Sequence, residues 1–190
     1  GVIETIDTAG VVGFTGEVLP PAIFLRPTPV TAGSHAIDAL AREAARGSRL
    51  ETLHALLVRI HRAVAYDTDA THALTTAAEA FAARRGVCQD HAHIFIAAAR
   101  ALTIPARYVT GYLLIEGDDA APAHHAWAEA FTDDLGWIGF DAANGISPTE
   151  YYARLAIGFD AASAAPVRGT MRGAGSEALN VEVVVKSGAQ

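Results

Sequence analysis

The positions of the apolar residues divide the chain into a helical part and a strand-like part. Between residues 34 and 102 apolar side chains recur at helical spacing, as in the stripe formed by Leu50, Leu53, Leu57, Ile60 and Val64. After Pro105 the period becomes strand-like, along 107–115, 124–131, 137–141 and, late in the chain, 180–186. Helices followed by antiparallel strands predict an α+β domain whose helices pack on one face of a sheet.

Capping residues mark where the helices are expected to begin and end. Ser34 is a predicted N-cap, and Gly47 is the stop of that helix. Two capping boxes, at 48–51 and 76–79, open the second and third helices. The stretch GVCQDHAHIFIAAARAL, residues 86–102, then predicts a fourth helix that ends near Leu102, before Pro105.

The first thirty residues differ from the rest of the chain. They contain strand-like pieces and then the proline-rich run LPPAIFLRPTPV. Such a segment is too short for an independent domain and is typical of a stiff linker. We expect residues 1–30 to be the remnant of an upstream β-rich domain with its linker, and residues 31–190 to form the main domain.

Composition and charge exclude several classes of function. The 190 residues are 51% hydrophobic and 18% charged, with a net charge of −7 and basic residues that are scattered. A nucleic-acid-binding protein normally carries a basic stripe, so we expect no nucleic-acid partner. No apolar run reaches the length of a membrane span and no signal peptide is seen, so we expect no membrane partner and a cytoplasmic location.

The single cysteine, Cys88, lies at the start of the predicted fourth helix. With one cysteine there is no internal disulfide, and a free thiol favours a reducing compartment. A helix N-terminus beside a histidine is where proteins stabilise a nucleophilic thiolate, and Gly86 permits the tight turn before it. The alternative is a buried, inert thiol, which is the commoner role of a lone cysteine.

A base and an orienting acid occur in the strand region. On a strand, His125, Trp127 and Glu129 share one face. If the following hairpin is centred on Asp133, His125 lies directly opposite Asp141, and Nδ1–H of His125 can meet the carboxylate. Gly136 permits another register, so this pairing is a hypothesis.

A metal site and an oxyanion site are the other roles weighed here. His91 and His93 are about 200° apart around a helix, so they do not share one ion, and no CxxC or HExxH pattern occurs. We therefore expect no metal. Gln89 is a candidate oxyanion donor, although its side chain points about 100° away from Cys88, so backbone N–H groups at the helix start are favoured. Trp127 is a candidate cleft wall whose indole N–H can donate.

The ordered motifs GVCQDHA, HHAWAEAF and GWIGFDAANG resemble those of the transglutaminase-like superfamily, in its bacterial branch. The resemblance continues through IPARYVTGYL and RLAIGFDAASAAPVRGTMRG and covers nearly the whole chain. It implies a papain-like α+β fold in which the cysteine helix packs on an antiparallel sheet. It also implies Cys88 as nucleophile, His125 as base and Asp141 as the orienting acid, with no metal or organic cofactor.

The resemblance leaves three functions open. The first is hydrolysis of amide or peptide bonds through an acyl-thioester, as in a cysteine protease or amidase. The second is transglutaminase-type acyl transfer from glutamine to an amine, which crosslinks proteins. The third is a non-catalytic scaffold or binding domain of the same fold. A protein or peptide substrate is expected for the first two.

Overall fold

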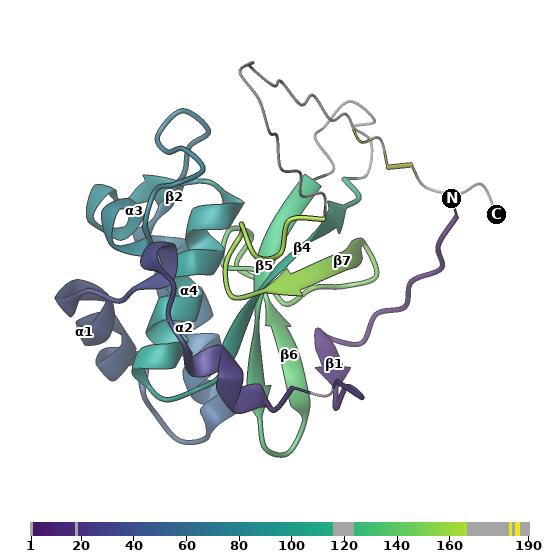
Figure 1. The fold of residues 1–190 in the computed structure, drawn as a ribbon, viewed down its shortest axis with the longest axis horizontal. Helices are drawn as coiled ribbons and strands as arrows, with labels where there is room; N and C mark the ends of the chain where they lie inside the picture. The colour runs from purple at the N-terminus through teal and green to yellow at the C-terminus, as the bar shows by residue number, and fades with distance from the viewer. Residues whose placement is uncertain (1, 18, 116–123, 167–182, 184, 187–190) are drawn as a thin grey trace, which may run out of the picture.

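The computed structural model describes residues 2–17, 19–115, 124–166, 183 and 185–186. Helices gather on one side of the molecule and a curled sheet on the other (Figure 1). The helices are α1 (His35–Ala44), α2 (Arg49–Ala63), α3 (Ala77–Ala83) and α4 (Cys88–Ala101), with short 3-10 helices at Pro21–Leu25 and Pro29–Thr31. The main strands are β1 (Val11–Gly13), β4 (Ala106–Leu113), β5 (His124–Thr132), β6 (Gly136–Phe140) and β7 (Tyr152–Gly158). The predicted α+β class is confirmed.

The capping residues position the helices as expected. The Ser34 hydroxyl accepts a hydrogen bond from the backbone of α1. At the start of α2, Glu51 N–H donates to Ser48 Oγ, and Ser48 N–H donates to the Glu51 carboxylate. The 76–79 box does the same for α3. Each box satisfies backbone donors that have no partner within the helix.

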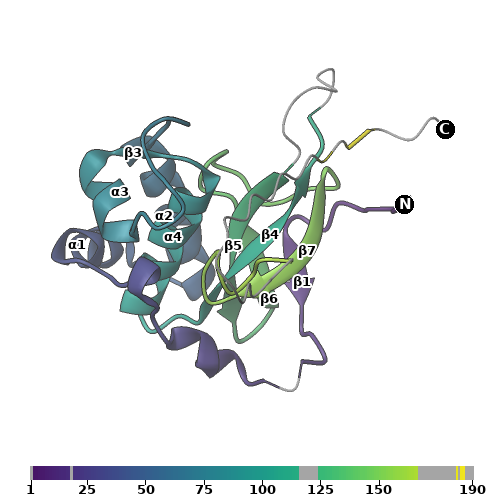
Figure 2. The same ribbon diagram turned by 45° about the horizontal axis from the view of Figure 1, so that its top comes forward.

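Within the described residues the main sheet has five strands in the order β1-β6-β5-β4-β7, and all neighbouring strands are antiparallel. Its helix-facing side carries small residues, Ala126, Ala128 and Ala130, which let α4 approach closely. Figure 2 shows α4 between the sheet and the other helices. The helix is therefore covered on both sides, and its residues from Asp90 to Ala99 are buried.

Beyond the predicted elements, the structure contains strands that the apolar pattern did not indicate. β7 pairs with β4 through a register shift between Thr110 and Gly111, which breaks any simple alternation. A two-stranded parallel sheet joins β2 (Ala65–Tyr66) to β3 (Arg85–Gly86). The strand predicted at 180–186 lies mostly outside the described residues.

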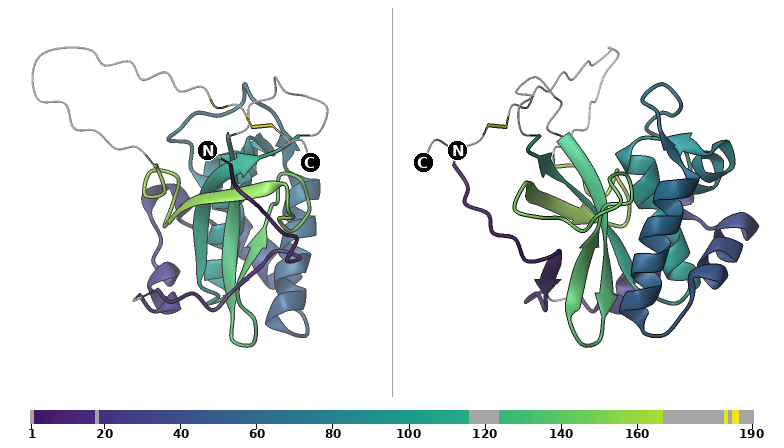
Figure 3. Two further views of the ribbon diagram at one scale, coloured as in Figure 1. Left: turned by 90° about the vertical axis from the view of Figure 1, so that its right-hand side faces the viewer. Right: turned by 180° about the vertical axis from the view of Figure 1, so that it is seen from behind.

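The N-terminal segment begins beside the sheet, on the side away from the helices (Figure 3), and ends with the 3-10 helix at Pro29–Thr31, which contacts α4. Its strand β1 pairs with β6, and Glu17 forms an ion pair of 2.6 Å with Arg107, which is fully buried. Part of residues 1–30 thus packs against the domain, and the assignment of this segment to an upstream domain stays a prediction.

Among the helices that the structure describes, none combines the length and the apolar character that a membrane span requires.

Candidate active site

Cys88 is the first residue of α4, and its side chain is partly exposed. The preceding turn is fixed by Asp90, whose carboxylate accepts hydrogen bonds from Val87 N–H at 2.8 Å and from the Thr71 hydroxyl at 2.6 Å. At Gly86 a Cβ would come within 2.6 Å of that carboxylate, so only glycine fits there. The thiol therefore stands at a helix N-terminus, as the sequence predicted.

His125, near the start of β5, lies between Cys88 and Asp141. Its Nε2 is 2.7 Å from Asp141 Oδ2, and its ring is also hydrogen-bonded with the Cys88 side chain. The expectation that Nδ1 would meet the carboxylate is wrong, because Nε2 makes that contact. Nδ1 is thereby left for the sulfur. The order of contacts along the site is thus Cys88, His125, Asp141.

The strand register that brings His125 to Asp141 differs from the expected one. β5 and β6 pair Thr132 with Gly136 and Ala128 with Phe140, so the hairpin is centred on Asp134 rather than Asp133. Gly136 takes a φ of 74°, which suits glycine in this turn. His125 and Asp141 are therefore diagonal rather than directly opposite. They remain on one face because the shift preserves the period of two.

Asp141 is held by several donors. Its Oδ1 accepts from the backbone N–H groups of Ala143 and Asn144, at 3.0 and 3.2 Å. Its Oδ2 accepts from the Asn144 side-chain amide and the Tyr152 hydroxyl, each at 2.8 Å, besides the contact with His125. Asn144 and Tyr152 were not predicted as site residues. Asn144 follows Asp141 in the DAANG motif, whereas Tyr152 carries no signal in the sequence.

Burial and hydrogen bonding act in opposite directions on the two ionisable partners. Burial disfavours a charged imidazole, but hydrogen bonding and charge from Asp141 and Cys88 outweigh it and raise the pKa of His125 to about 9. Burial would also raise the pKa of Asp141, yet the hydrogen bond and charge of His125, with the other donors, hold it below its usual value. The pair is thus arranged as imidazolium and carboxylate at neutral pH.

Tyr66 forms an exposed wall beside the thiol. It belongs to β2, is 58% exposed, and its backbone pairs with Gly86, two residues before Cys88. Partial burial, together with the charges of Cys88 and Asp141, raises the pKa of its phenol. Its hydroxyl is therefore within electrostatic reach of the site. Tyr66 reaches this position through the pairing of β2 with β3, which the sequence pattern did not indicate.

The two other predicted site residues, Gln89 and Trp127, lie close to Cys88 or His125. Gln89 directs its side-chain amide to the Ala73 carbonyl, 3.3 Å away. Trp127 is 3% exposed, and its ring stacks beside that of His125 with centroids 6.4 Å apart. It fits there because Gly111 has no side chain; a Cβ at Gly111 would come within 2.6 Å of the indole. The roles proposed for Gln89 and Trp127 stay predictions.

The histidines of α4 point to different parts of the fold. The ring of His91 faces the carbonyl oxygens of Val87 and Val64, whereas His93 Nε2 accepts from Ala161 N–H. Within the part of the chain that the structure describes, no three His, Cys, Asp or Glu side chains form a group suited to a metal ion.

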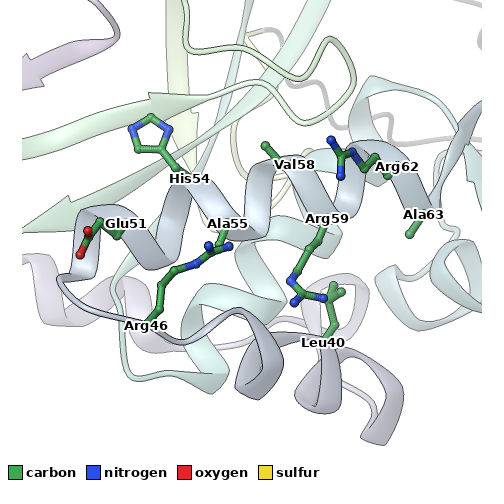
Figure 4. A pocket seen from close by; sticks show the side chains of 9 residues that line it. All are labelled: Leu40, Arg46, Glu51, His54, Ala55, Val58, Arg59, Arg62 and Ala63. Carbon is green, nitrogen blue, oxygen red and sulfur yellow. The ribbon is translucent and has the colours of Figure 1, made fainter.

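Two surface depressions frame the helical side. One of about 750 Å³ adjoins Tyr66 and is lined along β2 and β3, by Ala65, Tyr66, Asp67, Thr68, Ala83, Arg84 and Arg85. Another, of about 840 Å³, lies over α2 (Figure 4) and is lined by none of the three candidate catalytic residues. The first is also lined by none of those three residues, but it shares Tyr66 with the candidate site.

Known proteins with related sequences are longer than this chain. A protein of Mycobacterium leprae is 38% identical over 106 residues, which are 53% of this chain and 37% of that protein. A protein of Mycobacterium tuberculosis is 35% identical over 130 residues, or 63% of this chain and 41% of the other. Both are uncharacterized. The chain spans about two fifths of the length of these relatives.

Solved structures share the fold. A candidate cysteine protease of Cytophaga hutchinsonii is 32% identical with a TM-score of 0.64, and the match covers 85% of this chain and 55% of that one. The periplasmic domain of TgpA from Pseudomonas aeruginosa is 25% identical with a TM-score of 0.51, over 67% of this chain and 49% of that domain. The expected architecture of helices packed on an antiparallel sheet is confirmed by both.

A sequence model described as the transglutaminase-like superfamily matches residues 38–142, more than half of the chain. The matched span runs from α1 to the residue after Asp141 and so includes Cys88 and His125. Together with the fold, the match shows that this chain belongs to the transglutaminase-like superfamily.

Proposed function

We propose that this chain is a cysteine-dependent hydrolase of amide or peptide bonds, with Cys88 as nucleophile, His125 as acid and base, and Asp141 as the residue that orients the imidazole. The observation that carries the proposal is the continuous set of contacts from Cys88 through His125 to Asp141 at the start of a helix. A nucleophile, a base and an orienting group in that order are what covalent acyl transfer requires.

In the first step Cys88, whose thiol proton has passed to His125, attacks the carbonyl carbon of the substrate through its sulfur. The carbonyl π electrons move to oxygen, and the proposal assigns the stabilisation of that oxyanion to backbone N–H groups at the start of α4, assisted by the Tyr66 hydroxyl. His125 then gives its proton to the amine nitrogen as the carbon–nitrogen bond breaks. An acyl-thioester remains on Cys88.

In the second step water replaces the amine. His125 takes a proton from water as its oxygen attacks the thioester carbonyl, and the carbon–sulfur bond breaks to free the carboxylic acid. The sulfur leaves as thiolate, and the imidazolium beside it restores the starting ion pair. Asp141 supports both steps because its buried carboxylate stabilises the imidazolium and fixes its Nε2–H.

We favour hydrolysis over acyl transfer because one related structure, from Cytophaga hutchinsonii, is described as a candidate cysteine protease. An amine in place of water in the second step would give a transglutaminase reaction with the same residues. A protein or peptide substrate is part of the proposal, and the depression lined by Tyr66 along β2 and β3 is the surface proposed to receive it. We also propose that the protein acts in the cytoplasm, the compartment expected from its sequence.

The test uses the purified chain with a mixture of unstructured peptides, in the presence and absence of a labelled primary amine. Products are identified by mass spectrometry, and Cys88→Ala is the control. We expect cleaved or deamidated peptides that require Cys88. Labelled amine in place of hydrolysis would move the assignment to acyl transfer. Equal product from Cys88→Ala, or a wild-type Cys88 that iodoacetamide modifies only after unfolding, would overturn the enzyme proposal.

A further inference from the structure

The ring of His91 is a buried contact between two parts of the candidate site. The side chain is 1% exposed, with Nδ1 2.9 Å from the Val87 carbonyl and Nε2 3.1 Å from the Val64 carbonyl. A carbonyl oxygen only accepts hydrogen bonds, so the ring is the donor in any bond formed here. The Val64 contact joins residues 27 positions apart in the chain.

The two carbonyls belong to segments that carry different site residues. Val87 is the N-cap of α4 and directly precedes Cys88. Val64 is the C-cap of α2 and directly precedes β2, which contains Tyr66. The ring of His91 also stacks beneath that of Tyr66, with centroids 6.3 Å apart and an interplanar angle of 27°. His91 thus touches both sides of the site around the thiol.

The two bonds differ in what they add to the fold. The Val87 carbonyl already accepts from the backbone N–H groups of Asp90 and His91. The Val64 carbonyl is at the end of a helix, where carbonyls lack intrahelical donors. A proton on Nε2 therefore gives the Val64 carbonyl a donor that the helix does not supply. A proton on Nδ1 would instead give the Val87 carbonyl a third donor, in addition to the two backbone N–H groups that it already accepts from. The Val64 bond is the one that links separate elements.

We propose that His91 is a positioning residue, which holds Tyr66 beside Cys88 by donating from Nε2 to the Val64 carbonyl and by supporting the phenol ring from below. It acts on β2 and on Asp67, the residue after it: the N–H groups of Ala65 and Asp67 donate to the carbonyls of Arg84 and Gly86. The consequence for catalysis rests on the proposed function; the consequence for β2 does not.

His93 offers a matched control on the same helix. It is fully buried like His91, but its Nε2 accepts from Ala161 N–H at 3.1 Å, and its ring packs on Tyr108. Burial lowers the pKa of His93 to about 4, so it is neutral in this role. A substitution there disturbs the core without touching β2.

The experiment compares His91→Gln, His91→Asn and His93→Asn. The longer Gln side chain places its amide near the position of Nε2 and can reach the Val64 carbonyl, whereas Asn reaches only the position of Nδ1. Amide hydrogen exchange is measured at Ala65 and Asp67, the unfolding midpoint gives the global stability, and hydrolysis is measured as kcat and KM.

We expect His91→Asn to speed amide exchange at Ala65 and Asp67 about fivefold to tenfold, because this factor corresponds to the loss of about one net hydrogen bond. The variant should lower kcat/KM by a similar factor. His91→Gln should stay within about twofold of wild type in both. His93→Asn should lower the midpoint and leave β2 exchange unchanged. In a Tyr66→Ala background, His91→Asn should lose most of its effect on kcat/KM, because its route through Tyr66 is gone.

Unchanged exchange at Ala65 and Asp67 in His91→Asn would overturn the proposal, and so would equal changes in the Asn and Gln variants. Exchange that rises equally in His93→Asn would show a loss of global stability and would also refute it. If the wild type hydrolyses no substrate, the proposed function fails, while the exchange measurement still decides whether His91 positions β2.

Discussion

Replacing Asp141 by Asn tests the electrostatics of the site without changing its shape. The Asn oxygen can still accept from the backbone N–H groups of Ala143 and Asn144, but the negative charge beside His125 is lost. We expect the pKa of His125 to fall, because burial, which opposes the charged ring, then acts with less compensation. The ring should titrate at a lower pH than in the wild type.

The size of the effect follows from the raised pKa of His125. A rise from the ordinary value of 6.5 to about 9 corresponds to about 3 kcal/mol of preference for the charged ring in the folded protein, a preference to which both Asp141 and Cys88 contribute. Because the folded pKa is above the unfolded one, this stabilisation is fully present below pH 6.5 and is lost as the pH rises through about 9. The free energy of unfolding of the wild type should therefore exceed that of Asp141→Asn by the largest amount at pH 6.

The assay is urea unfolding between pH 6 and pH 10, together with an NMR titration of His125. A Cys88→Ala background removes the contribution of the thiol to the pKa of His125, so the pH-dependent difference that remains is due to Asp141. Asp160→Asn is the matched control, since Asp160 is a buried carboxylate that faces His93, which does not titrate in this range. A wild-type advantage over Asp141→Asn that stays constant from pH 6 to pH 10 would refute the assigned ion pair.

Three further substitutions test the support of the site. Tyr152→Phe removes a buried donor to Asp141 and should lower the unfolding free energy by about 1.5–3 kcal/mol, measured in urea; no change would show that the hydroxyl bond is not formed. Gly86→Ala should slow alkylation of the sole thiol several-fold, because its Cβ would press on the Asp90 carboxylate; an unchanged rate would contradict the tight turn. Arg107→Met should lower the free energy of unfolding by about 3–5 kcal/mol, because Glu17 and Glu129 lose their ion pairs with Arg107. The rate at which Cys88 is alkylated should stay unaltered. A neutral effect on stability would refute that last pairing.

The helical part was predictable because its signals are local. A capping box such as Ser48–Glu51 satisfies backbone groups within four residues, so the sequence contains both partners of each bond. The apolar stripe of α2 likewise needs only its own spacing. The start of α4 at Cys88 was found by the same reasoning, and its placement near His125 was inferred from the order of the motifs.

Residues that act across the fold were not predictable in this way. Tyr152 reaches Asp141 because β7 lies at the far edge of the sheet, next to β4. Tyr66 flanks Cys88 because two short parallel strands pair, and a strand of two residues has no periodicity to detect. In both cases the contact depends on strand order, and one sequence does not contain strand order.

The hairpin between β5 and β6 shows how an inexact register still predicted the contact between His125 and Asp141. The turn was placed one residue too early, which moves each strand partner by two positions. An error of two keeps every side chain on its face, so His125 and Asp141 stayed on the same side of the sheet and met as diagonal neighbours. A turn misplaced by half a residue would have shifted the partners by one and separated them across the sheet. The sheet face on which a candidate catalytic side chain lies is therefore predicted more robustly than the residue directly opposite it. The ring nitrogen of His125 that contacts Asp141, here Nε2 rather than Nδ1, depends on the angle at which the two side chains approach, and the register sets that angle.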